Sequence, residues 1–326
     1  MRKGFMNQWI IYILGAVVIG ILLLPVTVET SAGEGNVFIG EGATRVELSV
    51  EGFSQLQVET LVVYFEPDLE KLARETLQAL QEALALASRR LGIPATPLSI
   101  ALFAREDFGD IRALSFKMKQ PGIWPLFISR NWKSLQESDL YFQDMLYWTM
   151  PHEGIEGAVS LFFYHDRRSR WIGDGLATYA GYIVAREYTP QVTKERLNYY
   201  RQQVAKLLER GQVTYNLIKD FPVMSLEASG GKDPEVLRAG YVVSLAFWLG
   251  IAQRHGEETI RKFWGQVSTS PKMWCIALGL ICFGGVDAPK AARILSELTG
   301  GDIWAKLQKM DLHEVLRTLE QAAGVQ

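Results

Sequence analysis

The spacing of apolar residues changes near residue 150, and this change limits the folds that the chain can adopt. Short alternating or β-branched runs dominate the part before it, whereas the part after it repeats apolar residues every three or four positions. This order of patterns predicts an α+β fold. We expect a small mixed half of sheet and helix at residues 58–150, followed by an all-helical half at residues 151–326.

Strand and helix patterns alternate in the first part. Apolar residues alternate from Val46 to Val50, and the run Val58 to Phe65 is β-branched, which predicts two or three strands. Leucine and alanine then recur with a helical period until Gly92, as in an amphipathic helix. The further predictions are a helix at Leu69–Leu91, a strand at Leu98–Phe103, and loops with short strands such as Leu126–Ser129 within residues 106–132.

Almost all of the second part is predicted to be helical. Its most apolar stretches, Ala239–Ala252 and Trp274–Phe283, are too short to span a bilayer, so we expect both to be buried core. The predicted helices are a first one from Pro151 through Phe163, then Trp171–Glu187, Thr193–Arg210, Leu237–Gln253, Glu257–Gln266, and shorter helices from Ala288 to the C-terminus.

The N-terminus predicts the compartment. Arg2 and Lys3 precede an apolar run from Trp9 to Val26, which is about the minimum length for a membrane span, and the positive charges predict that this end stays cytoplasmic. We therefore interpret residues 1–33 as a transmembrane anchor, with a cleaved signal segment as the alternative. In both cases the chain after Ala32 is expected to face away from the cytoplasm. Residues 34–57 are interpreted as a glycine-rich linker and the first strands, and residues 58–326 as the functional domain.

Charge and cysteine content exclude some functions. The 34 basic and 36 acidic residues give a net charge of −2 and no basic surface for nucleic acid. The two cysteines, Cys275 and Cys282, form no Cys-x-x-Cys pair, so a thiolate zinc site is not supported. If their stretch were one helix, they would lie roughly 10 Å apart, too far for a disulfide, and we expect two buried thiols.

The residues with chemical potential lie at the junction of the two parts. Residues 152–156 read His-Glu-Gly-Ile-Glu within a predicted helix. His152 and Glu156 are four positions apart, so both side chains can point at one ion. Glu153 lies beside that face, where a carboxylate can hold a metal-bound water and accept its proton. Asp174, on the next predicted helix, is the candidate for a third ligand.

A second motif follows at residues 171–179, which read Trp-Ile-Gly-Asp-Gly-Leu-Ala-Thr-Tyr. The two motifs together resemble those of the gluzincin zinc metallopeptidases, the thermolysin and aminopeptidase-like clan, whose second motif is Trp-x-x-Glu-Gly-x-Ala-x-Tyr. The resemblance covers roughly residues 55–320. It implies a strand, helix and strand ahead of the metal helix, a helical subdomain after it, and hydrolysis of a peptide or protein. His152, Glu156 and Asp174 would hold zinc, and Glu153 would be the general base.

Two positions depart from that family's pattern. Glu156 stands where the family has a second histidine, and Asp174 stands where it has glutamate. One imidazole and two carboxylates make a harder site that is less selective for zinc and more tolerant of manganese or calcium. Asp174 is also one methylene shorter than glutamate, about 1.5 Å of reach, so the two helices must approach more closely. Zinc, manganese and no metal are all compatible with this sequence.

Other candidates are weighed beside this group. Tyr241 lies where the resembling family often carries a tyrosine that hydrogen-bonds the tetrahedral intermediate, so it is a second catalytic candidate, with core packing as the alternative. No Gly-x-Ser-x-Gly surrounds Ser160, which argues against a serine hydrolase. Four more residues are interpreted as loop: His165 beside the second motif, and Arg167, Arg168 and Arg170 as solvated residues or as a basic rim for a substrate carboxylate.

The sequence leaves alternative functions. The first is a membrane-anchored or secreted peptidase in which Glu153 activates a metal-bound water. The second is a catalytically inactive peptidase-like domain that binds a peptide or a partner in the cell envelope, which the changes at Glu156 and Asp174 motivate. A purely structural envelope protein is a third and weaker idea.

Overall fold

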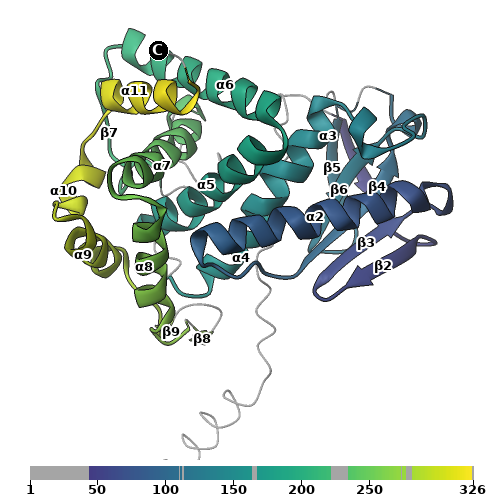
Figure 1. Cartoon of the computed structure of the whole chain (residues 1–326), viewed down its shortest axis with the longest axis horizontal. Helices are drawn as coiled ribbons and strands as arrows, with labels where there is room; N and C mark the ends of the chain where they lie inside the picture. Colours follow the sequence, from purple (N-terminus) through teal and green to yellow (C-terminus); the bar gives the residue numbers. More distant parts are fainter. Residues whose placement is uncertain are drawn as a thin grey trace, which may run out of the picture.

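A computed structural model describes residues 44–109, 111, 114–163, 167–221, 234–272, 274–276 and 281–324. The expected anchor and the glycine-rich part of the linker lie outside these residues. Within them, no helix combines the length and the apolarity needed to cross a membrane. The N-terminal half contains the larger sheet and the C-terminal half contains most of the helices, so the predicted α+β order is confirmed (Figure 1).

A four-stranded sheet in the order β2-β3-β4-β6 organises the N-terminal half. β2 is antiparallel to β3, whereas β3, β4 and β6 are parallel. The predicted run from Val58 to Phe65 is split, because the chain turns between β2 and β3 at Glu59, whose φ is 51°. The strands are β1 (Thr44–Leu48), β2 (Ser54–Val58), β3 (Leu61–Phe65), β4 (Leu98–Ala104), β5 (Leu114–Met118) and β6 (Ile123–Ile128), with β1 and β5 paired in parallel as a separate sheet.

Burial of both faces explains the nearly continuous apolar sequence of β4. Its residues Ile100 and Leu102 belong to the core between the sheet and helix α2 (Glu70–Leu91), which lies along one face (Figure 1). Ala101 and Phe103 point to the other face, where β1 and β5 add Leu48 and Phe116 to a second apolar cluster. As predicted, α2 ends at Gly92, which takes the left-handed conformation with φ 72°.

Helix α5 lies at the centre of the C-terminal half and packs against α4, α6, α7 and α2. Its buried residues form one large cluster with those of the surrounding helices. The helices are α3 (Leu140–Asp144), α4 (Met150–Ser160), α5 (Arg170–Tyr188), α6 (Pro190–Glu209), α7 (Pro234–His255), α8 (Glu257–Ser268), α9 (Ala288–Thr299), α10 (Ile303–Gln308) and α11 (Leu312–Ala322). The stretch from Ala239 to Ala252 lies within α7 and is mostly buried, as predicted.

The helix that carries the first motif begins earlier than Pro151. α3 continues into α4 through a π-helical segment, Met145–Thr149. Pro151 offers no backbone N–H and its ring crowds the preceding turn, so a wider turn directly before it removes the clash. At its other end α4 stops at Ser160, three residues before the predicted end at Phe163.

The expectation of an all-helical C-terminal half is wrong in detail. Two strand pairs lie among the helices, β7 (Thr214–Tyr215) with β10 (Met310–Asp311), and β8 (Trp274–Ile276) with β9 (Ile281–Phe283). The second pair replaces the helix considered for residues 274–283. Cys275 and Cys282 are opposite each other in the antiparallel register, so the helical separation of the two cysteines does not apply.

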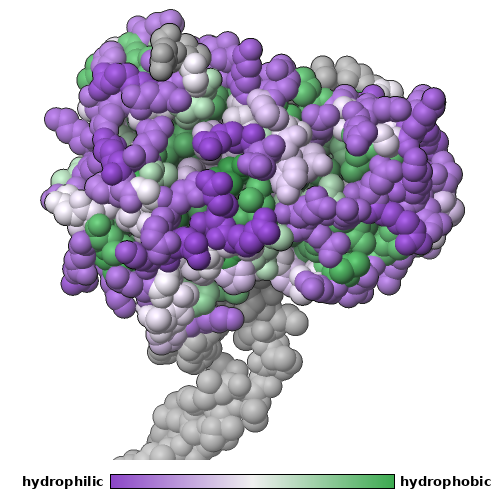
Figure 2. All heavy atoms as spheres, viewed as in Figure 1, coloured by the Kyte–Doolittle hydropathy of each residue, from purple (hydrophilic) through white to green (hydrophobic). Residues whose placement is uncertain are grey.

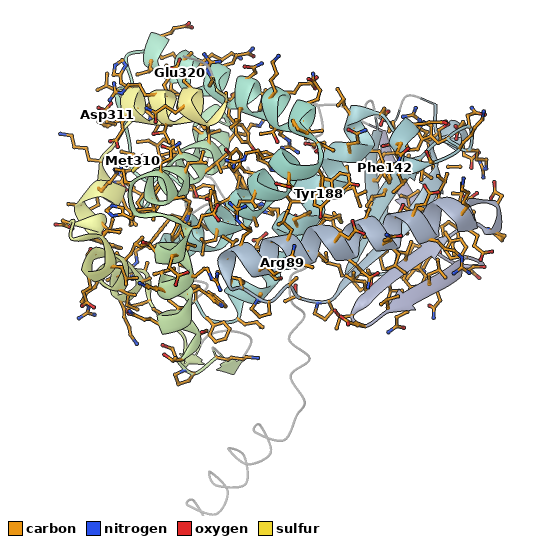
Figure 3. All side chains as sticks on the ribbon, in the orientation of Figure 1. Arg89, Phe142, Tyr188, Met310, Asp311 and Glu320 are labelled. Carbon is orange, nitrogen blue, oxygen red and sulfur yellow. The ribbon has the colours of Figure 1, made fainter. Side chains whose placement is uncertain are left out.

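Long-range ion pairs join the helices at their polar surfaces. Glu320 of α11, labelled in Figure 3, accepts from Arg201 of α6 at 3.3 Å. Arg90 of α2 binds Glu257 of α8, which also accepts from the Tyr179 hydroxyl at 3.2 Å. The face in Figure 2 is mostly hydrophilic, with apolar residues in separate patches.

Candidate functional site

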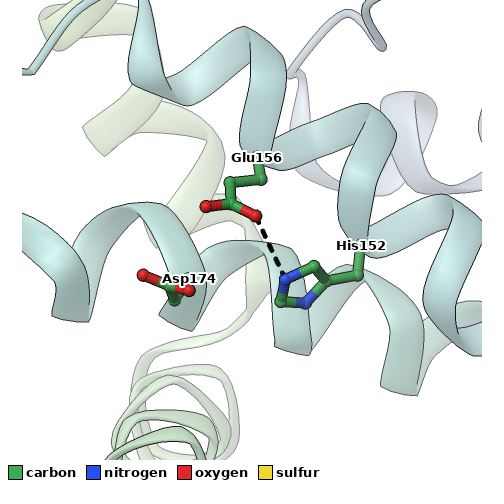
Figure 4. Close-up of side chains that lie close together, drawn as sticks. All are labelled: His152, Glu156 and Asp174. Carbon is green, nitrogen blue, oxygen red and sulfur yellow. Dashed lines mark ion pairs between the residues drawn. The ribbon is translucent and has the colours of Figure 1, made fainter. Parts of the chain in front are cut away.

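His152, Glu156 and Asp174 meet between α4 and α5 (Figure 4). One donor atom from each of these residues lies within 4.8 Å of the others, and they are the group with this property among the described residues. His152 and Glu156 come from successive turns of α4, as the spacing predicts, and Asp174 comes from α5. We call these three residues the cluster.

Glycine residues allow the helices around the cluster to approach. A Cβ atom on Gly157 of α4 would lie 2.4 Å from Thr96 Oγ1, in the segment that leads into β4. A Cβ atom on Gly175 of α5 would lie 2.2 Å from Ser244 Oγ of α7. Gly157 and Gly175 are therefore sites of close packing between helices and their neighbours. Gly175 in particular lets α7 bring Tyr241 to the cluster.

Both nitrogens of His152 have partners. Nε2 lies 3.3 Å from Glu156 Oε2, and Nδ1 lies 3.3 Å from the Thr178 hydroxyl oxygen. Thr178 donates its own proton to the backbone carbonyl of Asp174 at 2.6 Å, so its oxygen accepts from Nδ1. Burial alone would lower the pKa of His152, but the hydrogen bond to Glu156 and the nearby carboxylates raise it to about 9. The imidazole therefore carries a proton on each nitrogen at neutral pH.

Glu153 is half-buried beside the cluster. Burial raises the pKa of its carboxyl to about 7, with Glu156 and Asp174 adding to the rise and His152 opposing it. The carboxyl thus titrates near neutral pH, where a general base is most effective.

Arg170 binds the carboxylate of Asp174 from one turn away on α5. Its Nε lies 2.7 Å from Oδ2 and its Nη2 lies 3.0 Å from Oδ1, a two-point contact that engages both oxygens. The two side chains are only 13% and 8% exposed. Burial and Glu156 raise the pKa of Asp174, while Arg170 and His152 oppose the rise.

Tyr241 of α7 belongs to the same arrangement. Its hydroxyl oxygen accepts from Arg170 Nη2 at 2.7 Å, and its ring centre lies 6.4 Å from that of His152. Burial and the nearby Asp174 raise the pKa of the phenol. The guanidinium of Arg170 lies 4.5 Å from the ring centre of Phe221 and 5.3 Å from that of Tyr241. Aromatic faces and hydrogen bonds thus fix the position of Arg170.

The sequence interpretation of Arg170 as a solvated loop residue is wrong. Arg170 is the first residue of α5, and its spacing of four from Asp174 is the one sequence signal for the pair. Arg168 is exposed, as expected. The side chains of His165 and Arg167 lie outside the described part of the structure. Ser160 donates to the carbonyl of Gly157 at 2.9 Å, which is a helix contact with no role for a nucleophile.

The donor set has the chemistry of a divalent-metal site, but its arrangement does not fit an ion. A zinc ion requires a free lone pair on each donor atom about 2.0–2.2 Å away. Both oxygens of Asp174 accept from Arg170, and Nε2 of His152 faces Glu156. Two cationic side chains therefore already balance the charges of Glu156 and Asp174. An ion would have to displace the guanidinium.

Two pockets among the described residues lie away from the cluster. One of about 540 Å³ lies between α8 and α9, and one of about 220 Å³ is bordered by α5, α7 and α11. None of their lining residues belongs to the cluster, and neither pocket includes Arg170 or Tyr241.

Similarity to known proteins is found among solved structures. No family model and no curated protein matches the sequence. Among solved structures, native yeast LTA4 hydrolase is similar at 10% identity with a TM-score of 0.44, over 78% of this chain and 39% of that one. The same enzyme in complex with bestatin is similar at 10% identity and a TM-score of 0.43, over 79% and 39%.

The present chain thus spans about two fifths of the length of these structures. A TM-score below 0.5 does not establish a shared fold. The relation to gluzincin peptidases therefore remains a prediction from the two motifs.

Proposed function

We propose that this chain is a peptidase-like domain that binds a peptide or protein segment without hydrolysing it. The observation that carries the proposal is the two-point contact between Arg170 and Asp174. It engages the residue that a metallopeptidase would need as its third ligand. The same guanidinium also binds the hydroxyl of Tyr241, which is the second catalytic candidate.

The partner is inferred from what the motifs resemble. A peptidase-like site recognises an extended peptide, and the half-buried residues Glu156 and Tyr241 offer an acceptor and an aromatic face to one. Anchoring at residues 1–33 would place this site outside the cytoplasm, with envelope proteins or peptides as its partners. Membrane attachment and location are part of the proposal.

Metal-dependent hydrolysis is the competing function. The observation that favours it is the pKa of Glu153 at about 7, which suits a general base. In that case the cluster would hold the metal, which would polarise the scissile carbonyl and bind the attacking water, and Arg170 would have to leave Asp174.

The two functions are separated by testing binding and cleavage in the same samples. The purified full-length chain is mixed with a random peptide library, with and without added zinc or manganese, and analysed by mass spectrometry. We expect retained peptides, no new termini, and unchanged retention by Glu153→Gln. Tyr241→Ala should weaken retention, whereas Tyr199→Ala, an exposed tyrosine on α6, should not. Metal-dependent cleavage that Glu153→Gln abolishes would overturn the proposal.

A further inference from the structure

Contacts with several residues hold Arg170 beside the cluster. It reaches Asp174 within one turn of α5, so the two groups are already held close by the helix. It donates to Tyr241 and lies against the rings of Phe221 and Tyr241. Phe221 is 1% exposed, so the guanidinium packs against a ring that belongs to the core.

The guanidinium of Arg170 does what a bound metal cation would do at this site. It supplies positive charge to the buried Asp174 and the half-buried Glu156, and it donates to both oxygens of Asp174. The lone pair of each oxygen that points at the guanidinium is therefore not available to a metal on that side of Asp174. A divalent ion beside it would also be repelled by a like charge at short range in a site of low dielectric constant.

We infer that Arg170 decides the metal selectivity of this site: it takes the place of a divalent cation and excludes one from His152, Glu156 and Asp174. The inference rests on the proposed function and deepens it, because it names the residue that makes the site non-metallic. Without the guanidinium, the cluster offers one imidazole nitrogen and two carboxylates, a donor set that suits zinc or manganese.

The test measures metal binding by the full-length chain. Wild type, Arg170→Leu and Arg170→Gln are stripped with a chelator, checked for folding by circular dichroism, and titrated with zinc and manganese by calorimetry. The matched control is Arg186→Leu, which removes an arginine of the same helix that contacts Tyr182 and no residue of the cluster. We expect one ion per chain in the Arg170 variants, bound at least about tenfold more tightly than by wild type or the control.

A second variant shows where the ion binds. Adding Asp174→Asn to Arg170→Leu should abolish the new binding, because it removes one of the three donors. The inference would be overturned if wild type and both Arg170 variants bound the metal ions equally tightly, or if none of them bound a metal ion.

Thermal melting keeps the inference testable if the Arg170 variants do not fold without metal. Zinc should restore folding and raise the Tm of Arg170→Gln and Arg170→Leu but leave wild type unchanged, and no rescue in either variant contradicts the inference. The outcome is independent of peptide retention. If wild type retains peptides but the Arg170 substitutions do not change metal binding, the inference is refuted and the proposed function stands. Metal-dependent cleavage by wild type would refute the proposed function.

Discussion

Two arginines of this protein sit among carboxylates, and they differ in burial. Arg130 follows β6 and binds Glu66, Asp68 and Asp107, which follow the neighbouring parallel strands β3 and β4. Its side chain is 36% exposed, whereas that of Arg170 is 13% exposed and makes a two-point contact with Asp174. The arginine with three carboxylate partners is thus the one in greater contact with water.

The number of ion pairs that a side chain makes is therefore a poor guide to their contribution to stability. Exposed pairs are screened by water and contribute about 0–1 kcal/mol each. A buried pair contributes little net stability when intact, but removing one partner leaves an unpaired charge and costs about 3–5 kcal/mol. We therefore expect Arg130 to be replaceable and Arg170 to be essential to the metal-free fold.

The largest effect is expected for Arg170→Leu in the absence of metal. The substitution leaves Asp174 buried without its partner, so the free energy of unfolding should fall by about 3–5 kcal/mol. Urea denaturation measures the loss. Arg170→Leu combined with Asp174→Asn removes both charges and should recover part of it. A loss below about 1 kcal/mol would show that the Arg170 pair contributes no more than an exposed ion pair, which contradicts the expected difference between Arg170 and Arg130.

The second effect is a fall in stability with rising pH. The pKa of His152 in the folded protein is about 9, above its ordinary value of 6.5, so protonation of His152 stabilises the fold fully below pH 6.5. The contribution should disappear as the pH rises through 9, and it amounts to about 3 kcal/mol. Denaturation at pH 7.5 and 9.5 measures the fall at two values that both lie above the pKa of Glu153, which is about 7. His152→Asn should show a smaller difference, and an NMR titration of His152 near 6.5 would contradict the expectation.

Glu153→Gln is expected to have a smaller effect, and this substitution should stabilise the fold. Burial raises the pKa of Glu153 to about 7, so its ionised form destabilises the fold as the pH rises from 4.5 through 7. The neutral amide should therefore stabilise the protein by about 1–2 kcal/mol at pH 8 and by much less at pH 5. Glu209→Gln, at an exposed position, is the control. Equal effects of the two substitutions at pH 8 would indicate that Glu153 is well hydrated.

The smallest effect is expected for Arg130→Ala. Three exposed ion pairs are lost, yet the free energy of unfolding should fall by no more than about 1–2 kcal/mol, and by less at high salt. Denaturation in low and high sodium chloride measures both quantities. A loss as large as that of Arg170→Leu would show that the carboxylates beside Arg130 cannot be hydrated in its absence.

Local pattern predicted most of the elements. Helix α2 with its end at Gly92, strand β4 and helix α5 follow from apolar spacing and turn residues that lie within each segment. The errors fall where partners far along the chain decide the conformation. Residues 274–276 and 281–283 form paired strands although their apolar run is equally compatible with a buried helix.

Residue spacing alone was enough to predict which side chains could meet. The spacing of His152 and Glu156 places both on one face of a helix, and the second motif supplies Asp174 on the next. The pairing of Asp174 with Arg170 depends on tertiary packing, because α7 and Phe221 enclose Arg170 from distant parts of the chain. The same four-residue spacing on a solvated helix would leave the guanidinium in water. Burial makes its contact with Asp174 strong enough to compete with a metal ion.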